Sequence, residues 1–215
     1  MKKLLLFTLI FCLFVSSSIF SAKNNNLQIN SPESISINFI NTIHNDKKKQ
    51  ELFNHILYSY IDKNELNKLT TLINSNVIDS QKIFKSLSID LALYFYSKYS
   101  AKKTIEFLQT LSPNLISYLT ETCFYEALKQ NNINDAILFS ESLNNNIIYS
   151  RLVLSIIEFY LQNDNISSAV KWLIQIELPS ENDLALNLFC SYYAKKKNFS
   201  DLELNIKLIQ SPEIK

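Results

Sequence analysis

The chain contains no glycine in its 215 residues. Phosphate-binding loops, dinucleotide-binding fingerprints and the nucleophile elbow all need glycine where the backbone turns sharply or approaches a ligand. The sequence therefore excludes these catalytic and cofactor-binding motifs. Its turns must be made by Asn, Ser and Pro, which suits helices joined by short bends and suits β-hairpins poorly. We accordingly expect an all-α fold.

The first 22 residues have the pattern of a secretory signal peptide. Lys2 and Lys3 form a basic start, and an apolar run over residues 4–15 precedes a serine-rich stretch. We expect cleavage in the serine-rich stretch or after residue 22, and export to the periplasm or the medium. The alternative is an uncleaved membrane anchor, because residues 4–20 reach the lower limit of about 17 residues for a spanning helix.

The charge balance gives no sign of a polyanionic partner. The chain has 21 basic and 20 acidic residues, so loss of two lysines with the signal leaves a net charge of about −1. The tightest basic run, residues 47–49, is more typical of a solvated helix start than of a nucleic-acid contact. We expect no nucleic-acid partner, and contact with a membrane only if the N-terminal segment stays uncleaved.

A six-residue phrase recurs along the chain about every 33 residues. The clearest copies begin at Asn131, Asp164 and Lys197, and weaker copies begin at Asn64 and Tyr99. Periods of about 20 to 50 residues indicate stacked supersecondary units. Apolar residues at three- and four-residue spacing flank the copies, which predicts a helix on either side. Asn or Ser within the phrase would cap the second helix, so each unit is predicted to be a helical hairpin.

These hairpins resemble the tetratricopeptide repeat, a helix-turn-helix of about 34 residues whose first helix ends near a tyrosine and whose second contains an alanine. The second-helix alanine appears as Ala136 and Ala169, and prolines close units at Pro113, Pro179 and Pro212. The tyrosine position is held by Tyr60, Phe95, Ala127, Tyr160 and Tyr193. The resemblance implies a right-handed solenoid of about five antiparallel helical hairpins.

The chain departs from the tetratricopeptide pattern at the consensus glycine, where the two helices of a hairpin touch. That position is occupied by Leu57, Ala92, Phe124, Ile157 and Cys190. Three of these side chains are bulky, which predicts splayed hairpins or membership of a neighbouring class of helical repeat. We expect three parts in the chain: a signal peptide over 1–22, a polar leader with an N-terminal capping helix over 23–49, and the repeats over 50–215.

Two cysteines lie beyond the signal, Cys123 and Cys190, two repeats apart. Packed helices lie about 8–10 Å apart, whereas a disulfide needs Cα atoms within about 7 Å. We therefore predict two buried free thiols. The two histidines, His44 and His55, lack the neighbours that a zinc site or a catalytic triad requires.

The resemblance also implies a binding groove, because the first helices of tetratricopeptide repeats line the inner surface. Tyrosines there would suit a peptide or helix, and Arg151, the only arginine, could hold a carboxylate. Alternatively, Arg151 pairs with Glu121 or Glu158. The partner-binding residues carried over to this chain are Tyr58, Tyr96, Tyr125, Glu121, Arg151, Glu158 and Asn187.

Together these patterns predict an exported helical-repeat scaffold that binds a protein or peptide in its groove, performs no chemistry and needs no cofactor or metal. A reading of Glu121 and Glu158 as an acid/base pair is disfavoured, since two glutamates on a helical surface are common. Two alternatives stay open. One is a helical accessory domain related to cell-wall hydrolases, and the other is a membrane-tethered structural spacer.

Overall fold

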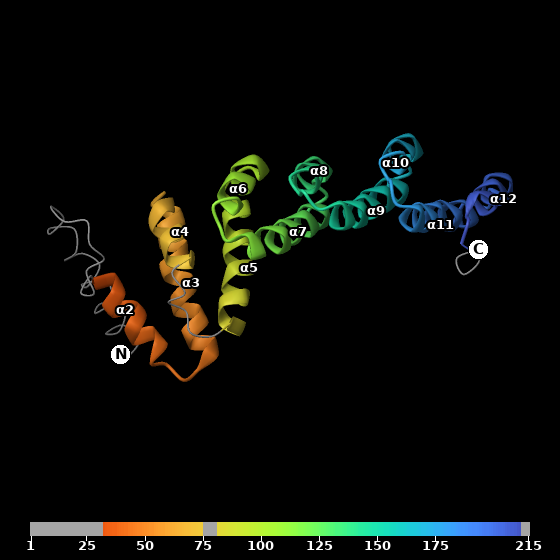
Figure 1. The fold of residues 1–215 in the computed structure, drawn as a ribbon. Coiled ribbons are helices and arrows are strands. Elements are labelled where there is room, and N and C mark those ends of the chain that lie inside the picture. Colours follow the sequence, from red (N-terminus) through yellow and green to blue (C-terminus); the bar gives the residue numbers. More distant parts are fainter. Residues whose placement is uncertain (1–31, 75–80, 212–215) are drawn as a thin grey trace. The chain divides into compact units, whose positions relative to one another are not determined.

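The computed structural model describes residues 32–74 and 81–211, and all regular structure within them is helical (Figure 1). The expected all-α class is confirmed for these ranges, which contain no strand. The expected signal peptide and polar leader lie outside the described residues. The chain divides into two compact units, Met1–Leu87 and Ser88–Lys215, and the division falls inside helix α5.

Within the described residues, the first unit contains three complete helices and the start of a fourth. They are α2 (Pro32–Asn41), α3 (Asp46–Asp62), α4 (Leu66–Asn74) and the N-terminal part of α5 (Gln81–Lys98). Helix α2 ends at Asn41, and Asn45 caps the next helix by accepting from the amide of Lys48. The expected start of the repeats at residue 50 therefore lies within α3.

Lys49 differs from the solvated helix start expected for residues 47–49. Its side chain is buried, and its Nζ donates to the carbonyl of Asn41 at 2.9 Å. Asn41 is the last residue of α2, where the carbonyl groups of a helix have no intrahelical partner and attract a cation. The lysine therefore joins α3 to the end of α2.

Long and short helices alternate in the second unit. After the remainder of α5 come α6 (Ala101–Leu108), α7 (Pro113–Lys129), α8 (Ile133–Glu141), α9 (Asn146–Gln162), α10 (Ile166–Leu173), α11 (Pro179–Lys195) and α12 (Phe199–Leu208). Helix α7 packs against α8, α9 against α8, α10 and α11, and α11 against α12. Each long helix from α7 onward thus contacts the short helix that follows it.

The turns before α4, α8, α10 and α12 each contain a residue in the left-handed region. With no glycine in the chain, this conformation, with φ near 57°, is taken by Asn64, Asn131, Asp164 and Lys197. In the second of these turns the amide of Asn131 bonds to the carbonyl of Leu128, and that of Asn132 to Ala127, at 2.9 and 2.8 Å. This pair of bonds is the Schellman motif, which satisfies the last carbonyls of the preceding helix.

The residue after each of the three later turns caps the next helix, as the recurring phrase predicts. Asn132, Asn165 and Asn198 each accept, through the side-chain oxygen, from the backbone amide three residues ahead. Ser100 does the same for α6. Two adjacent residues therefore end a long helix and cap the next short one, which explains why the phrase is so short.

Replacing Lys197 with glycine is expected to raise the free energy of unfolding by about 0.5–1 kcal/mol. A lysine pays steric strain at positive φ that glycine does not, and this gain exceeds the entropy that glycine adds to the unfolded chain. Urea titration measures the change. Asn131→Gly is the matched control and should gain less, because asparagine tolerates the left-handed region; equal gains at both positions would contradict this explanation.

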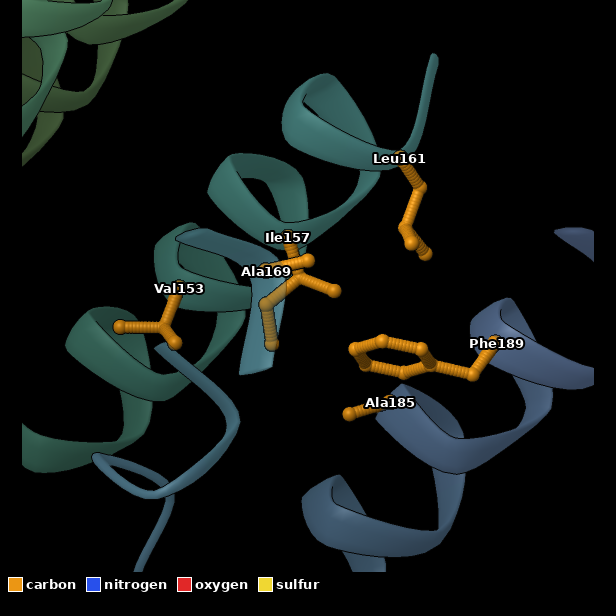
Figure 2. Close-up of a cluster of buried hydrophobic side chains, with 6 residues drawn as sticks. All are labelled: Val153, Ile157, Leu161, Ala169, Ala185 and Phe189. Atoms are coloured by element: carbon orange, nitrogen blue, oxygen red, sulfur yellow. The ribbon is translucent and has the colours of Figure 1, made fainter. Parts of the chain in front are cut away.

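A cluster of buried side chains joins three helices near the C-terminal end (Figure 2). The ring of Phe189, on α11, points toward the α9 side chains around Ile157. The full cluster is Val153, Ile157, Leu161, Ala169, Ala185 and Phe189. It therefore connects the α9 and α10 pair to the next long helix.

Cys123 and Cys190 are buried free cysteines, as predicted. Burial raises the pKa of the Cys123 thiol to about 12 and also raises that of Cys190. Both thiols are thus held in the protonated, unreactive form at neutral pH.

The chain after α12 folds back onto α11. Ile209 is buried against Leu186 and Cys190, and the side chain of Asp183 accepts from the amides of Gln210 and Ser211 at 3.0 and 2.7 Å. Asp183 is itself buried. The acidic side chain therefore anchors the segment that follows the last helix.

Candidate functional site

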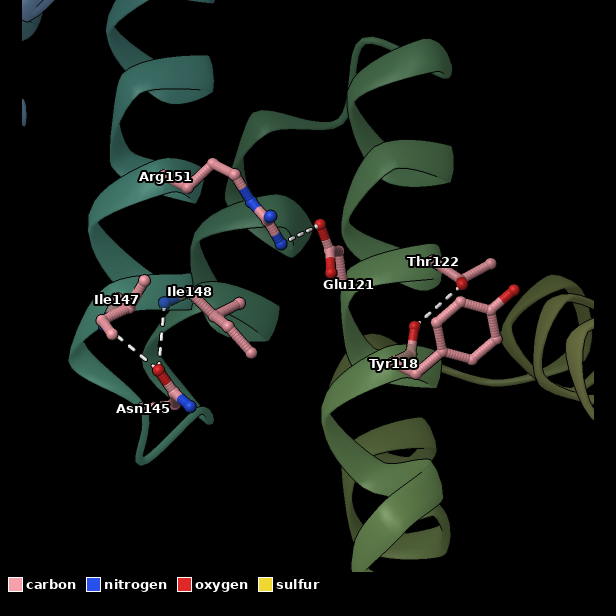
Figure 3. A network of polar contacts seen from close by, with 7 residues as sticks. All are labelled: Tyr118, Glu121, Thr122, Asn145, Ile147, Ile148 and Arg151. Carbon is pink, nitrogen blue, oxygen red and sulfur yellow. Dashed lines mark hydrogen bonds and ion pairs between the residues drawn. The ribbon is translucent and has the colours of Figure 1, made fainter.

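The candidate surface is built on α7, α9 and α11, which are all 17 residues long. They begin at Pro113, Asn146 and Pro179, so equivalent residues are 33 apart. Proline at the first helical position suits a start that needs no amide donor. The middle helix instead relies on Asn145, whose side chain accepts from the amides of Ile147 and Ile148, both at 3.1 Å (Figure 3).

Arg151 and Glu121 form an ion pair that joins α9 to α7 (Figure 3). The guanidinium Nη2 lies 2.6 Å from the Glu121 carboxylate. This confirms the alternative that Arg151 pairs with a neighbouring glutamate. The arginine side chain is 55% exposed, so the pair is expected to contribute at most about 1 kcal/mol to stability. The pair therefore adds little to the stability of the fold.

Tyr125 presents its ring to solvent from α7, with 42% of the residue exposed. The ring packs edge to face on Phe124, which is fully buried, with centroids 5.1 Å apart. Contact with a fixed core ring limits the orientations of the exposed one, so little entropy is lost when a ligand covers it.

Glu158 and Asn187 are also exposed, on α9 and α11. The carboxylate of Glu158 accepts from the side-chain amide of Gln162, one turn ahead, at 3.2 Å. Thus five of the predicted binding residues lie on α7, α9 and α11. Tyr58 does not belong to this set, because it is a half-buried residue of α3 in the first unit.

Tyr96 is buried, which corrects its prediction as a groove residue. Its hydroxyl donates to Asp135 at 2.8 Å, and its ring stands edge-on to Phe139 with centroids 5.2 Å apart. Burial first, and then the bond to the Asp135 carboxylate, raises the pKa of Tyr96. The tyrosine therefore fixes α5 to α8 and is not available to a ligand.

Two residues that were not predicted for the site occupy the position equivalent to Arg151 on the other two long helices. Tyr118 on α7 and Leu184 on α11 lie 33 residues before and after it, at the equivalent helical position. Tyr118 is half-buried, its carbonyl accepting from Thr122 (Figure 3), and Leu184 is exposed. Applying the repeat period to Arg151 would have found both.

A second polar cluster crosses from the turn after α9 to α11. Asp164 accepts from the hydroxyl of Tyr192 at 3.1 Å and lies 2.6 Å from the Nζ of Lys196. The bond to Lys196, and then the one to Tyr192, lowers the pKa of Asp164. A depressed carboxyl pKa stabilises the fold above the unfolded-state pKa, and the contribution is lost as pH falls through the folded-state value.

We expect NMR titration of the Asp164 carboxyl to give a midpoint below the ordinary value of about 3.9. Lys196→Gln should move that midpoint upward, because the glutamine removes the charge of the main partner. Lys195→Gln, one residue away, is the control and should leave it unchanged. Equal shifts in the two variants would indicate general charge and would refute the specific contact.

Within residues 32–74 and 81–211, no cluster of three or more His, Cys, Asp or Glu side chains is placed to bind a metal ion. The same residues include no helix with the length and apolar character to span a bilayer. No family model matches the chain, and no curated protein or solved structure is significantly similar to it.

Proposed function

We propose that the protein is an exported, non-catalytic scaffold that binds a protein or peptide across α7, α9 and α11. In this proposal the helices form a right-handed, tetratricopeptide-like solenoid of antiparallel hairpins, and these three line its concave side. The pairing of each long helix from α7 onward with the following short one supports the arrangement. The left-handed turns 33 residues apart at Asn131, Asp164 and Lys197 support it too.

The observation that carries the proposal is the set of side chains left exposed on these helices. Tyr125 and Leu184 are large and apolar yet partly exposed to solvent. Arg151, also exposed, holds the position on α9 that Leu184 holds on α11. Tyrosine and arginine are enriched at the energetic centres of protein interfaces. The surface therefore offers an aromatic contact, an aliphatic contact and a guanidinium to one ligand.

The same contacts favour binding over catalysis. Glu121 is paired with Arg151, and Glu158 bonds to Gln162 on an exposed surface. A carboxylate pair used for acid/base chemistry is held in environments that separate the two pKa values, usually with one group shielded from water. Glu158 has no such shielding, and each glutamate already has a local partner.

Export rests on the signal pattern of residues 1–22. The two other candidates, an accessory domain for a cell-wall hydrolase and a membrane-tethered spacer, make different predictions. Mass spectrometry of the mature N-terminus separates the tether from the exported form, because an uncut chain begins at Met1. Binding to purified cell-wall polymer, in place of a protein, would favour the accessory domain.

The binding surface is tested with a partner isolated from envelope extract and then purified. The double variant Tyr125→Ala, Arg151→Ala is expected to bind this partner at least about tenfold more weakly. Truncating a central contact of this type costs about 2 kcal/mol of binding free energy. Val170→Ala, Lys171→Ala removes two exposed side chains of α10 and is the matched control. Equal affinity of both variants and the parent would rule out the α7, α9 and α11 surface.

A further inference from the structure

Helix α12 differs from the other short helices of its unit in having no buried residue. Helices α6, α8 and α10 each contain at least one buried side chain. The inner side of α12 is occupied by Leu202 and Ile206, which pack partly buried against Leu186 and Cys190 of α11. The remaining sides of the helix are therefore its exposed surface.

That exposed surface is rich in large apolar side chains, although Asp201, Glu203, Asn205 and Lys207 lie on the same helix. Phe199, Leu204 and Leu208 are 68%, 57% and 62% exposed. Asn205 is only half-exposed and donates to the carbonyl of Asp201 within the helix. Because large exposed apolar surfaces mark interaction sites, this surface indicates a partner.

The charges beside the leucines point to the identity of that partner. Glu203 and Lys207, one turn apart, form an exposed ion pair at 2.7 Å, and both lie on the same flank of Leu204. In an antiparallel helix pair related by a twofold axis, each flank faces its own copy with the direction reversed. Glu203 would then face Lys207 of the second copy, and Lys207 would face Glu203, so the flank is complementary to itself.

We propose that α12 is a self-association surface through which two copies of this chain form an antiparallel, twofold-symmetric dimer. Leu204 and Leu208 form the apolar centre of the contact, and the Glu203 and Lys207 flank sets its direction. The surface is separate from α7, α9 and the exposed face of α11, so the dimer leaves the proposed groove open. The dimer proposal does not depend on whether that groove binds a peptide.

The test is sedimentation equilibrium of the full chain, purified in the form that the expressing cells produce. We expect a mass twice that of the monomer measured by mass spectrometry. Glu203→Lys and Lys207→Glu should each give a monomer, because each places like charges opposite one another. The double variant Glu203→Lys, Lys207→Glu restores opposite charges across the contact and should restore the dimer. An equimolar mixture of the two single variants should dimerise as well, although the ion pair within each α12 stays broken, and a purely structural effect on α12 would not produce that outcome.

Val170→Glu, Ile174→Lys changes two exposed apolar residues in and just after α10 and is the control for general solubility effects. It should remain dimeric. A monomeric parent chain overturns the proposal and leaves the apolar surface to another partner. Single charge reversals that stay dimeric, or a double variant that stays monomeric, also overturn it.

Discussion

Replacing Phe189 with alanine is expected to lower the free energy of unfolding by about 3–5 kcal/mol, the largest effect of any single change considered. Phe189 is 2% exposed, and its ring lies in the cluster that joins α9, α10 and α11. Truncation removes apolar contact area and leaves a cavity that rigid helices on three sides fill only in part. Urea titration followed by circular dichroism measures the loss.

Two control variants test whether the loss of stability comes from the buried position of the Phe189 ring. Phe189→Leu refills most of the space and should recover the larger part of the lost free energy. Phe39→Ala removes the same side chain from an exposed position on α2 and should change stability by less than about 0.5 kcal/mol. A small effect at Phe189, similar to that at Phe39, would mean that α11 does not pack on α9 through this ring.

Replacing Asp183 with alanine is expected to lower the free energy of unfolding by about 3 kcal/mol. Its two carboxylate oxygens accept from the amides of Gln210 and Ser211. A hydrogen bond to a charged group contributes about 1.5–3 kcal/mol, and amides left without an acceptor add a desolvation cost. Asp183→Asn keeps one acceptor oxygen and should lose about half as much.

Hydrogen exchange localises the effect of the Asp183 variants. The amides of Gln210 and Ser211 should be protected in the parent chain and should exchange rapidly in Asp183→Ala, while amides in the middle of α7 keep their protection. Glu181→Gln, two residues earlier in α11, is the control and should change neither stability nor exchange. Unchanged protection at residues 210 and 211 would contradict the anchoring role of Asp183.

The repeat period was sufficient to predict the helices and their caps in the second unit. The apolar spacing and the Asn residues act locally, so Asn132, Asn165 and Asn198 are recognisable as caps without knowledge of the fold. The period also predicted that the two cysteines would not form a disulfide, and both are free in the structure. Features set within one turn of helix were therefore accessible from the sequence.

Features that depend on distant partners were not accessible. Tyr96 fits the groove position of its repeat, but its hydroxyl meets Asp135, 39 residues away, and the ring is drawn into the core. Asp183 is buried because the chain after α12 supplies two amide donors, whereas an isolated aspartate is normally exposed. The burial of Lys49 likewise depends on where α2 ends.

The most direct test of the account is a methyl-to-aromatic NOE experiment on protein labelled at Ile and Val methyl groups and at Phe rings. In the structure, α9, α10 and α11 pack through a shared core, with Phe189 of α11 in the same buried cluster as Val153 and Ile157 of α9. This packing predicts cross-peaks from the Phe189 ring to the methyl groups of Ile157 and Val153. Cross-peaks from that ring confined to residues of α11 and α12 would contradict it.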